Sequence, residues 1–351
     1  MAPPIKPHRP PHSEKNPFRG DIREFRSALT DWFLENGRDL PWRTFPPRDP
    51  YSVLVSEIML QQTQVATVVD YYERWMERFP DVRTLAAAPE SDVLHAWQGL
   101  GYYSRARNLH AAARVIAGDY GGIFPRATER ILALPGVGPY TAAAVATFAF
   151  DQPTPPVDAN IIRVTARLLD YCKPIDNAAG LSHIRAAAEQ WQPSEEEGGA
   201  GIFNEALMEL GALVCTPRSP RCSACPVRIF CRAEAPETLP LKRPRPRRVE
   251  LEEHCGWIVR DDQVLLEQQT GKRWRGLWRL PILTEPHSGI PLAALAYPFT
   301  HHRVNLSVFP GTTPLFLTEN QHWFSLAELE AGPMTAPHRR ALQKLLPKAH
   351  A

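Results

Sequence analysis

Lysine is scarce in this sequence of 351 residues. The 40 basic side chains include seven lysines, and none lies between Lys15 and Lys173. This gap excludes a lysine nucleophile from that stretch, because only an amine can form a Schiff base with a carbonyl carbon. A bias toward arginine and alanine can come from genomic base composition, so the arginine count alone is weak support for nucleic-acid binding.

Several other features are absent. No apolar run approaches the length that spans a membrane. Residues 1–20 are rich in proline and histidine but lack the apolar core of a signal peptide, so we expect a disordered tail. The net charge of +2 does not by itself indicate a polyanionic partner. With 44% hydrophobic residues, the chain is expected to fold into two or three domains.

Four cysteines stand in the frame C-x6-C-x2-C-x5-C, directly after a predicted helix over residues 204–213. They are Cys215, Cys222, Cys225 and Cys231. A structural zinc site usually pairs two C-x2-C knuckles, and here only one pair has that spacing. The frame therefore favours a 4Fe–4S cluster over zinc. Disulfides rank third among the alternatives, because nothing else in the chain suggests a secreted protein. For the same reason Cys172 and Cys255 are expected to be reduced.

Hydrophobic periodicity predicts helices from Asp21 to about Cys231. Small polar residues, Ser91, Thr128 and Asp158, are expected to cap three of them. An acidic, glycine-rich segment, Pro193–Gly201, is predicted to be a surface loop. The expected helices are Tyr51–Gln62, Val65–Phe79, Ser91–Trp97, Ser104–Ala117, Thr128–Leu134, Tyr140–Phe150 and Ala159–Leu169.

The composition changes after the cysteines. Pro236–Arg248 interleaves basic residues with prolines, which is typical of a stiff linker; it could be a solvated connector or a strap that contacts phosphate. His254–Val259 and Gln263–Gln268 alternate apolar and polar residues around Asp261-Asp262, which predicts a β-hairpin. Further strands are expected at Val304–Phe309 and Leu315–Leu317, with a closing helix at Pro337–Leu346. An all-α portion thus precedes a smaller α+β portion.

A glycine-rich turn, LPGVGPYT (134–141), joins two predicted helices. Gly136 and Gly138 permit backbone angles that a side chain would forbid. Pro139 suits the first turn of the helix that follows. The amides at that helix N-terminus can bind a phosphate. A plain tight turn is the commoner cause of Gly-x-Gly, but the whole segment favours a helix-hairpin-helix that grips a nucleic-acid backbone.

Two carboxylates could divide acid and base chemistry. Glu57 has apolar neighbours on both sides along its helix, so burial should raise its pKa toward the range of a general acid. Asp158 precedes a helix, where the helix dipole should hold it anionic. Taken alone, each has a simpler explanation: a surface glutamate and an N-cap. Together they match the pair of groups that cleaves glycosidic bonds through an oxocarbenium-like transition state.

Taken together, these motifs resemble the endonuclease III superfamily of DNA glycosylases, and within it the MutY-type adenine DNA glycosylases. The resemblance runs from about Phe25 into the C-terminal domain. The segments that carry it are LPWR (40–43), SEIMLQQTQV (56–65), GLGYYSRARNLH (99–110), LPGVGPYT (134–141), VDANIIRV (157–164), NEALMELGALVC (204–215) and the cysteine frame.

The resemblance implies a multidomain fold. An all-α helix-hairpin-helix glycosylase region with an iron–sulfur cluster module would precede an α+β, Nudix-like C-terminal domain that recognises 8-oxoguanine. The implied parts are a tail (1–20), a catalytic region (21–235) with a six-helix barrel module (about 48–152) and a cluster module (about 21–47 plus 153–235), a basic linker (236–250) and the C-terminal domain (251–351).

The resemblance also implies catalytic roles. Glu57 would protonate N7 of adenine as the C1′–N9 bond breaks, and Asp158 would stabilise the sugar cation. Tyr140 would support the acid chemistry, and Asn160 would hydrogen-bond Asp158. Gln62 and Tyr102 would fill or wedge the base stack. The residues expected around the flipped adenine are Arg43, Glu209, Leu40 and Trp42, and those expected to grip the backbone are Gly136, Val137 and Gly138.

Four differences from related sequences refine the prediction. Bifunctional members carry a lysine where this chain has Tyr140, so we expect a monofunctional enzyme without efficient lyase activity. Residues 282–296 contain one acidic residue, Glu285. Nudix enzymes have several glutamates that bind magnesium at this place, so we expect no pyrophosphatase activity. The 8-oxoguanine loop has Phe299-Thr300-His301 where serine is usual. Ala159 replaces a commoner glycine, which a helical residue should tolerate.

The function implied is removal of adenine opposite 8-oxoguanine or G in double-stranded DNA, by a cytoplasmic, nucleoid-associated bacterial monomer with a 4Fe–4S cluster and no membrane partner. One alternative is a glycosylase of the same superfamily that acts on thymine or an oxidised pyrimidine. Another is a non-catalytic binder of damaged DNA, which would need neither Glu57 nor Asp158. A nucleotide-pool Nudix hydrolase is the last alternative, and the missing glutamates argue against it.

Overall fold

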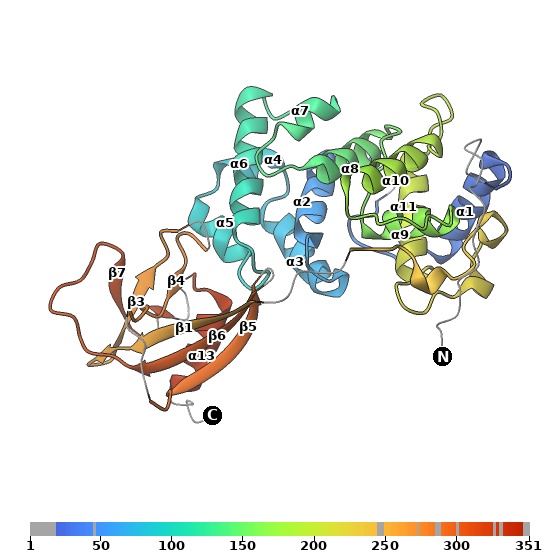
Figure 1. Ribbon diagram of the computed structural model, residues 1–351. Coiled ribbons are helices and arrows are strands. Elements are labelled where there is room, and N and C mark those ends of the chain that lie inside the picture. The colour runs from blue at the N-terminus through green and yellow to red at the C-terminus, as the bar shows by residue number, and fades with distance from the viewer. Residues whose placement is uncertain are drawn as a thin grey trace, which may run out of the picture. The chain divides into compact units, whose positions relative to one another are not determined.

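The computed structural model describes residues 19–44, 47–243, 249–271, 274–284, 289–299, 302–325, 328–329 and 333–346 (Figure 1). The chain forms two compact units. Unit 1 combines Met1–Ile58 with Ile123–Arg243, and unit 2 combines Met59–Gly122 with Pro244–Ala351. The expected tail, except residues 19 and 20, lies outside the described residues. The module boundaries expected from the sequence stay predictions.

Unit 1 is built from helices. Helix α11 is central, since it packs against α1, α8 and α9. Around it, Phe25 makes edge-to-face contacts with Trp191, Phe203 and Phe230, with ring centroids 5.5–6.0 Å apart. The elements are α1 (Ile22–Asn36), α2 (Pro50–Leu60, which continues into unit 2), α7 (Thr128–Leu132), α8 (Pro139–Phe150), α9 (Ala159–Leu168), α10 (Ala178–Gln190), α11 (Ala200–Leu213) and the 3-10 turns η1 (Cys222–Ala224), η2 (Arg228–Phe230) and η3 (Pro236–Thr238).

Unit 2 contains helices and two small sheets. In the first sheet β6 lies between β1, which is parallel to it, and β5, which is antiparallel. In the second, β3 pairs antiparallel with β2, β4 and β7. The elements are α3 (Val65–Arg78), α4 (Val82–Ala87), α5 (Glu90–Ala96), α6 (Ser104–Asp119), β1 (Val249–Trp257), β2 (Val259–Arg260), β3 (Gln263–Gln268), β4 (Trp278–Arg279), β5 (Ala293–Phe299), β6 (His302–Pro310), β7 (Gln321–Ser325) and α13 (Ala336–Leu345).

The helices expected from periodicity are confirmed, within a few residues at their ends. Two helices were not expected, α4 and α10, which begin at the side-chain caps Asp81 and Asn177. Of the three predicted caps, only Asp158 is confirmed. Ser91 lies inside α5, and Thr128 is the first residue of α7. In the described part of the chain, no helix has the length and apolar character to cross a membrane.

The β region corrects two expectations. The turn at Asp261 joins β2 and β3 as predicted, but residues 254–257 continue β1, which pairs with β6 in the other sheet. Leu315–Leu317 is not a strand. Leu315 and Phe316 are 94% and 87% exposed, so their apolar character does not reflect burial. The loop Pro193–Gly201 is confirmed up to Ala200, where α11 begins.

The start of the predicted linker is fixed to unit 1. The carbonyl of Leu239 accepts a hydrogen bond from Arg167 Nε at 3.1 Å. The backbone amide of Arg243 donates to the Asp176 carboxylate at 3.0–3.1 Å. Residues 244–248 lie outside the described residues. Residues 241–243 are exposed to solvent even though they are hydrogen-bonded to unit 1, so the solvated connector and the phosphate-contacting strap both stay predictions.

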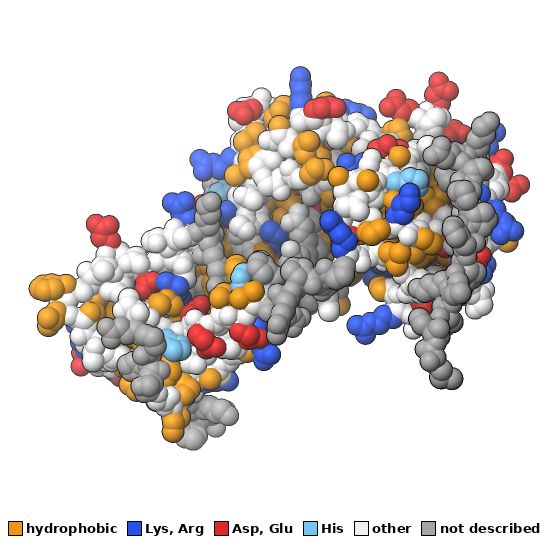
Figure 2. Space-filling view, viewed as in Figure 1, with side chains coloured by type: hydrophobic (Ala, Val, Ile, Leu, Met, Phe, Trp, Pro, Cys, Tyr) orange, Lys and Arg blue, Asp and Glu red, His pale blue; other side chains and the backbone are white. Residues whose placement is uncertain are grey.

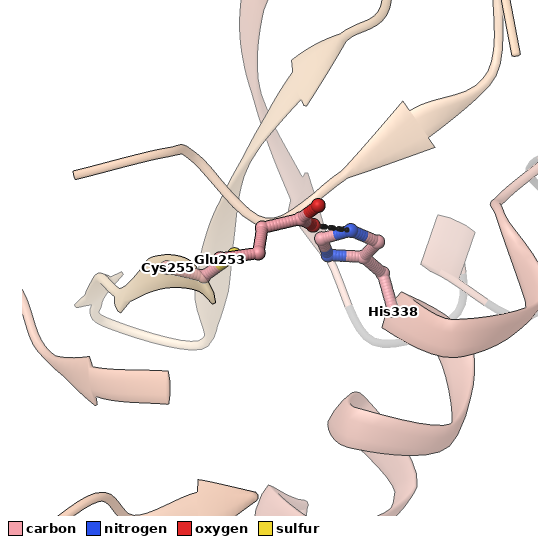
Figure 3. Close-up of side chains that lie close together, drawn as sticks. All are labelled: Glu253, Cys255 and His338. Carbon is pink, nitrogen blue, oxygen red and sulfur yellow. Dashed lines mark hydrogen bonds and ion pairs between the residues drawn. The ribbon is translucent and has the colours of Figure 1, made fainter. Parts of the chain in front are cut away.

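A hydrogen-bond network ties three elements of unit 2 together. Glu253 on β1 pairs with His338 Nε2 on α13 at 2.9 Å (Figure 3). Glu253 also accepts from the Tyr297 hydroxyl on β5 at 3.1 Å. His338 Nδ1 accepts from the Leu280 amide at 3.3 Å, which places the ring proton on Nε2. Cys255 is fully buried beside them, within 4.8 Å of both groups. Both imidazole nitrogens are engaged, so this closeness is explained without a metal ion.

We predict that Glu253→Ala destabilises unit 2 by about 2 kcal/mol or more, because two buried donors lose an acceptor. Urea denaturation followed by tryptophan fluorescence measures this change. The control is Glu250→Ala, an exposed residue on the same strand. Equal midpoints for the two variants would show that the network does not stabilise the fold.

Candidate active site

Glu57 lies on α2 among apolar residues, and only 6% of its surface is exposed. The Tyr140 hydroxyl, from the first turn of α8, donates to its Oε2 at 2.7 Å. The predicted burial of Glu57 and the predicted proximity of Tyr140 are both confirmed. A phenol this close can stabilise the ionised form of the carboxyl that remains after a proton has been given up.

Asp158 caps α9, as predicted. Its Oδ1 accepts from the Ile161 amide and its Oδ2 from Asn160 Nδ2, both at 2.7 Å. Asn160 is oriented in turn by Arg163, whose Nη2 donates to Asn160 Oδ1 at 2.8 Å. Arg163 also donates from Nε to the carbonyl of Cys215 at 2.8 Å. One continuous set of hydrogen bonds thus joins Asp158 to the first cysteine of the frame.

This arrangement requires α9 and α11 to lie close together, and Gly211 makes that possible. A Cβ at Gly211 would stand 2.6 Å from Asn160 Cβ, closer than real Cβ contacts allow. Ala159 is the first residue of α9, so alanine is accommodated there as expected. The glycine in NEALMELGAL is therefore a packing requirement of the site.

Burial is the largest influence on the pKa values of Glu57, Tyr140 and Asp158. It raises the pKa of Glu57 to about 7, and the nearby Asp158 and Glu205 add to this, against the hydrogen bond from Tyr140 and the charge of Arg43. Burial also raises the pKa of Tyr140 well above its usual value. For Asp158, burial outweighs its hydrogen bonds and raises the pKa, which is opposite to the direction expected from the helix dipole alone.

The residues predicted to contact a flipped base lie on the segment before α2 and on α11. Leu40 and Trp42 are 8% and 7% exposed. Arg43 Nη2 pairs with Glu209 Oε2 at 2.9 Å, and Arg38 holds both oxygens of the same carboxylate at 2.7–2.8 Å. Burial alone would raise the pKa of Glu209. Hydrogen bonds from Arg38 and Arg43 outweigh burial and lower this pKa to about 2. Glu209 is thus a fixed anion.

The predicted hairpin turn is present between α7 and α8. Gly136 has φ +73°, where glycine is favoured. Gly138 has φ −95°, an ordinary angle, so the expectation that it needs glycine for its backbone is wrong; its Cβ position is open. Gly138 is the N-cap of α8 and has no side-chain cap. Val137 is buried and anchors the turn.

Gln62 and Tyr102, the predicted wedge residues, belong to unit 2. Both have positive φ, 56° and 48°, which costs energy for residues other than glycine and is common at functional turns. Arg105 holds both turns. It donates to the carbonyl of Gln61 at 2.6 Å and to the carbonyl of Gly101 at 3.3 Å. Tyr102 is 57% exposed.

The four cysteines of the frame are free thiols, so the disulfide alternative is wrong for them. Arg167 Nη1 donates to Cys215 Sγ at 3.2 Å. Burial, and then the charges of the other three cysteines, raise the pKa of Cys225 to about 11 against a backbone hydrogen bond from Val227. The four sulfurs therefore lie within electrostatic reach of one another. Cys172 and Cys255 are also free thiols, as expected.

The predicted 8-oxoguanine loop is described only at its first residue. Phe299 ends β5, pairs with His302 and lies against the Trp274 ring. Thr300 and His301 lie outside the described residues.

Comparison with known proteins places the chain in a family. Residues 55–193 match the family described as HhH-GPD superfamily base excision DNA repair protein. A solved structure of a thermostable thymine-DNA glycosylase is 33% identical in sequence, with a TM-score of 0.53. The match covers 60% of this chain and 94% of that structure. The chain belongs to the HhH-GPD superfamily. A trapped endonuclease III–DNA covalent intermediate shares this fold, with 26% identity and a TM-score of 0.50.

Within this superfamily, the resemblance to the MutY type is confirmed. Adenine DNA glycosylase of Mus musculus is 44% identical over 253 residues, which are 70% of this chain and 48% of that protein. The chain thus spans about half the length of this relative. The HhH-GPD fold, with an α/β C-terminal region, agrees with the expected fold class at this level.

The sequence reasoning missed Arg38, Arg48, Arg105 and Arg163. Individual arginines carry little positional information in a sequence so rich in this residue. One available signal was the spacing of Glu205 and Glu209. Two carboxylates four residues apart lie on one face of a helix, and most other residues of this helix are apolar. Buried acids of that kind need buried partners.

We predict that Glu57→Gln stabilises the HhH-GPD region at pH 8 by roughly 3 kcal/mol at most. The folded state binds more protons than the unfolded chain between pH 4.5 and about 7, so stability falls as pH rises through this window. The gain should vanish below pH 4.5. Urea midpoints at pH 4.5 and 8 measure it, with Glu189→Gln, an exposed residue, as the control. A pH-independent difference would contradict the raised pKa.

Proposed function

We propose that the protein is a base-excision-repair glycosylase that removes adenine mispaired with 8-oxoguanine or G from double-stranded DNA. The observation that carries this proposal is the buried Glu57, whose pKa of about 7 leaves a large protonated fraction at neutral pH. The similarity to adenine DNA glycosylases supports adenine as the target.

The geometry supports a division of labour between two carboxyls. Glu57 donates its proton to the leaving base, and the Tyr140 hydroxyl then stabilises the carboxylate formed at Oε2. Asp158 is ordered by Ile161 and Asn160 near the same site, where its negative charge stabilises an oxocarbenium-like sugar. Since the acid must be protonated, the rate falls as pH rises through about 7.

Local groups support DNA binding better than the overall charge does. Basic and acidic side chains are interspersed on the face shown in Figure 2, in keeping with the net charge of +2. The Gly136–Gly138 turn presents the uncapped N-terminus of α8, which favours a phosphate. The positive φ at Gln62 and Tyr102 is consistent with turns that enter a base stack.

The four-cysteine frame suits a 4Fe–4S cluster. Burial, and then the charges of neighbouring cysteines, raise the pKa of Cys225 and Cys231, so these thiols ionise together only with added positive charge. Cys215, Cys222, Cys225 and Cys231 would hold the group, which would supply that charge and cross-link residues 215–231. Arg167 would donate to the first thiolate. We assign no step of the reaction to it.

We also propose that the C-terminal region is a Nudix-like domain that recognises 8-oxoguanine, without pyrophosphatase activity. The two small sheets with α13 are consistent with this α+β assignment. A second candidate function is removal of thymine, which the 33% identity to a thymine-DNA glycosylase supports. Lyase activity is not expected, because the sequence from residue 16 to 172 contains no lysine.

We predict adenine release under single-turnover conditions from duplexes with A opposite 8-oxoguanine and A opposite G, but not A opposite T. Strand breaks should appear only after hot alkali, and borohydride should trap no stoichiometric adduct. A duplex with T opposite G tests the second candidate. Release of thymine alone would transfer the assignment to that function, and release from no duplex by cluster-containing protein would favour a binder.

Glu57→Gln and Asp158→Asn should each lower the single-turnover rate by about 10²-fold or more, because each removes a group used in the transition state. Glu189→Gln serves as the exposed control. Turnover that survives in Asp158→Asn would rule out the assigned mechanism.

Cys222→Ser should lose the brown 4Fe–4S absorbance and most of its iron, measured by visible spectroscopy and metal analysis. Cys172→Ser, at an exposed thiol outside the frame, should keep both. Stoichiometric zinc in place of iron would support the zinc alternative.

A further inference from the structure

Two exposed side chains, Gln62 and Tyr102, lie on separate turns of unit 2. The first turn, residues 61–64, joins α2 to α3, and the second turn, residues 97–103, joins α5 to α6. Both backbones have positive φ, which residues other than glycine keep only where the surrounding structure enforces it. Gln62 is exposed and Tyr102 is 57% exposed, so burial of these side chains does not enforce it.

Arg105, on the first turn of α6, holds the first of these turns from beneath. Only 8% of Arg105 is exposed. Its Nη1 donates to the carbonyls of Met59 and Gln61 at 2.9 and 2.6 Å. Its Nη2 donates to Thr63 Oγ1 at 3.3 Å. The residues on both sides of Gln62 are therefore fixed to one guanidinium.

The same guanidinium holds the second turn. Nη2 of Arg105 also donates to the carbonyls of Leu100 and Gly101 at 3.1 and 3.3 Å. The Gly101 carbonyl accepts in addition from Trp97 Nε1 at 3.0 Å. The guanidinium carbon lies 5.3 Å from the ring centroid of Trp97 and 5.6 Å from that of Tyr102, within the range of cation–π attraction. The backbone before Tyr102 and its ring thus share the anchor of the first turn.

This arrangement requires an arginine. A guanidinium is planar and offers its donors in a rigid fork, whereas the ammonium group of lysine is a compact point charge. Only the fork can serve carbonyls on two separate turns at once. Burial lowers the pKa of Arg105, so the folded protein keeps this charge inside at a cost. A shared anchor also means that one turn cannot shift without breaking hydrogen bonds to the other.

We propose that Arg105 is a positioning residue that couples the two turns, so that Gln62 and Tyr102 enter the base stack together when the target nucleotide is extruded. This inference deepens the proposed function and rests on it, because only an enzyme that extrudes a base needs side chains to fill the stack. Arg105 acts through the turns and does not itself contact the substrate.

The first test is Arg105→Lys in the full chain with its cluster, with folding checked by circular dichroism and visible absorbance. On a duplex with A opposite 8-oxoguanine, the single-turnover rate at saturating protein should fall about tenfold or more, because several hydrogen bonds from a charged group are lost. Retention of the positive charge should not rescue the rate. The control is Arg114→Lys, an exposed arginine on the same helix, which should keep it.

The base pairs that flank the target separate this role from a structural one. Extrusion must overcome stacking and pairing, so a variant limited by extrusion should be slowest between G·C pairs and recover part of its rate between A·T pairs. A loss of stability alone would lower the rate equally in both contexts. If folded Arg105→Lys shows the same flank dependence as the unchanged protein, the proposal is overturned.

A double-mutant cycle tests the coupling without changing Arg105. Gln62→Gly and Tyr102→Gly each remove a side chain but permit the positive φ of the turn. If the turns act as one unit, the double variant should be no more than about threefold slower than the slower single variant. Rate losses that simply multiply would show that the turns act separately. This cycle decides the question if Arg105→Lys does not fold.

Hydrogen exchange followed by mass spectrometry gives a readout that needs no DNA. In Arg105→Lys, the amides of residues 61–64 and 97–103 should both exchange faster, and in Arg114→Lys neither should. If both turns loosen but the unchanged protein releases no base, the proposed function fails and the coupling stands. If the unchanged protein releases adenine but only one turn or neither loosens, the inference fails and the proposed function stands.

Discussion

The burial of one ionisable carboxyl, Glu57, is the constraint on which the rest of the site depends. An isolated carboxylate inside a protein is costly, so the group either stays protonated or acquires partners. Glu57 does both in part: it has a hydrogen-bond partner, and its ionisation is disfavoured. Tyr140 donates to Glu57, while Asp158 and Glu205 oppose its ionisation. The result is a pKa of about 7, which is where a general acid is most effective.

The starts of two helices bring the partners of Glu57 into place. Tyr140 reaches Glu57 because α8 begins directly after the Gly136–Gly138 turn, so in the proposed function one turn would serve both the DNA backbone and the acid. Asp158 is placed by the start of α9, and α9 approaches α11 as closely as Gly211 allows. Arg163 and Arg167 then tie α9 to Cys215. Damage to the cysteine frame would therefore reach Asp158 through Arg163 and Asn160.

Much of this site could be predicted from the sequence, and the limits have physical causes. Glu57, Asp158, Tyr140 and the cysteines stand in local motifs whose chemistry is specific, and helix periodicity located most helices. The pairing of β1 with β6 was not predictable from alternation, which gives strands but not their neighbours. Leu315 and Phe316 were mistaken for a strand because apolar character was taken for burial.

The arginine partners were hidden for another reason, since a long-range ion pair leaves no periodic trace. Glu205 and Arg48 are separated by 157 positions, and only the acidic member carries a local signal. That signal is the presence of two acids one turn apart on an apolar helix. The two differ in consequence: Glu209 is held as a fixed anion by two arginines, whereas Glu205 lies within electrostatic reach of Glu57. Both carboxylates tie α11 to the arginines of residues 38–48, which accounts for two buried acids on a helix where leucines would pack at lower cost.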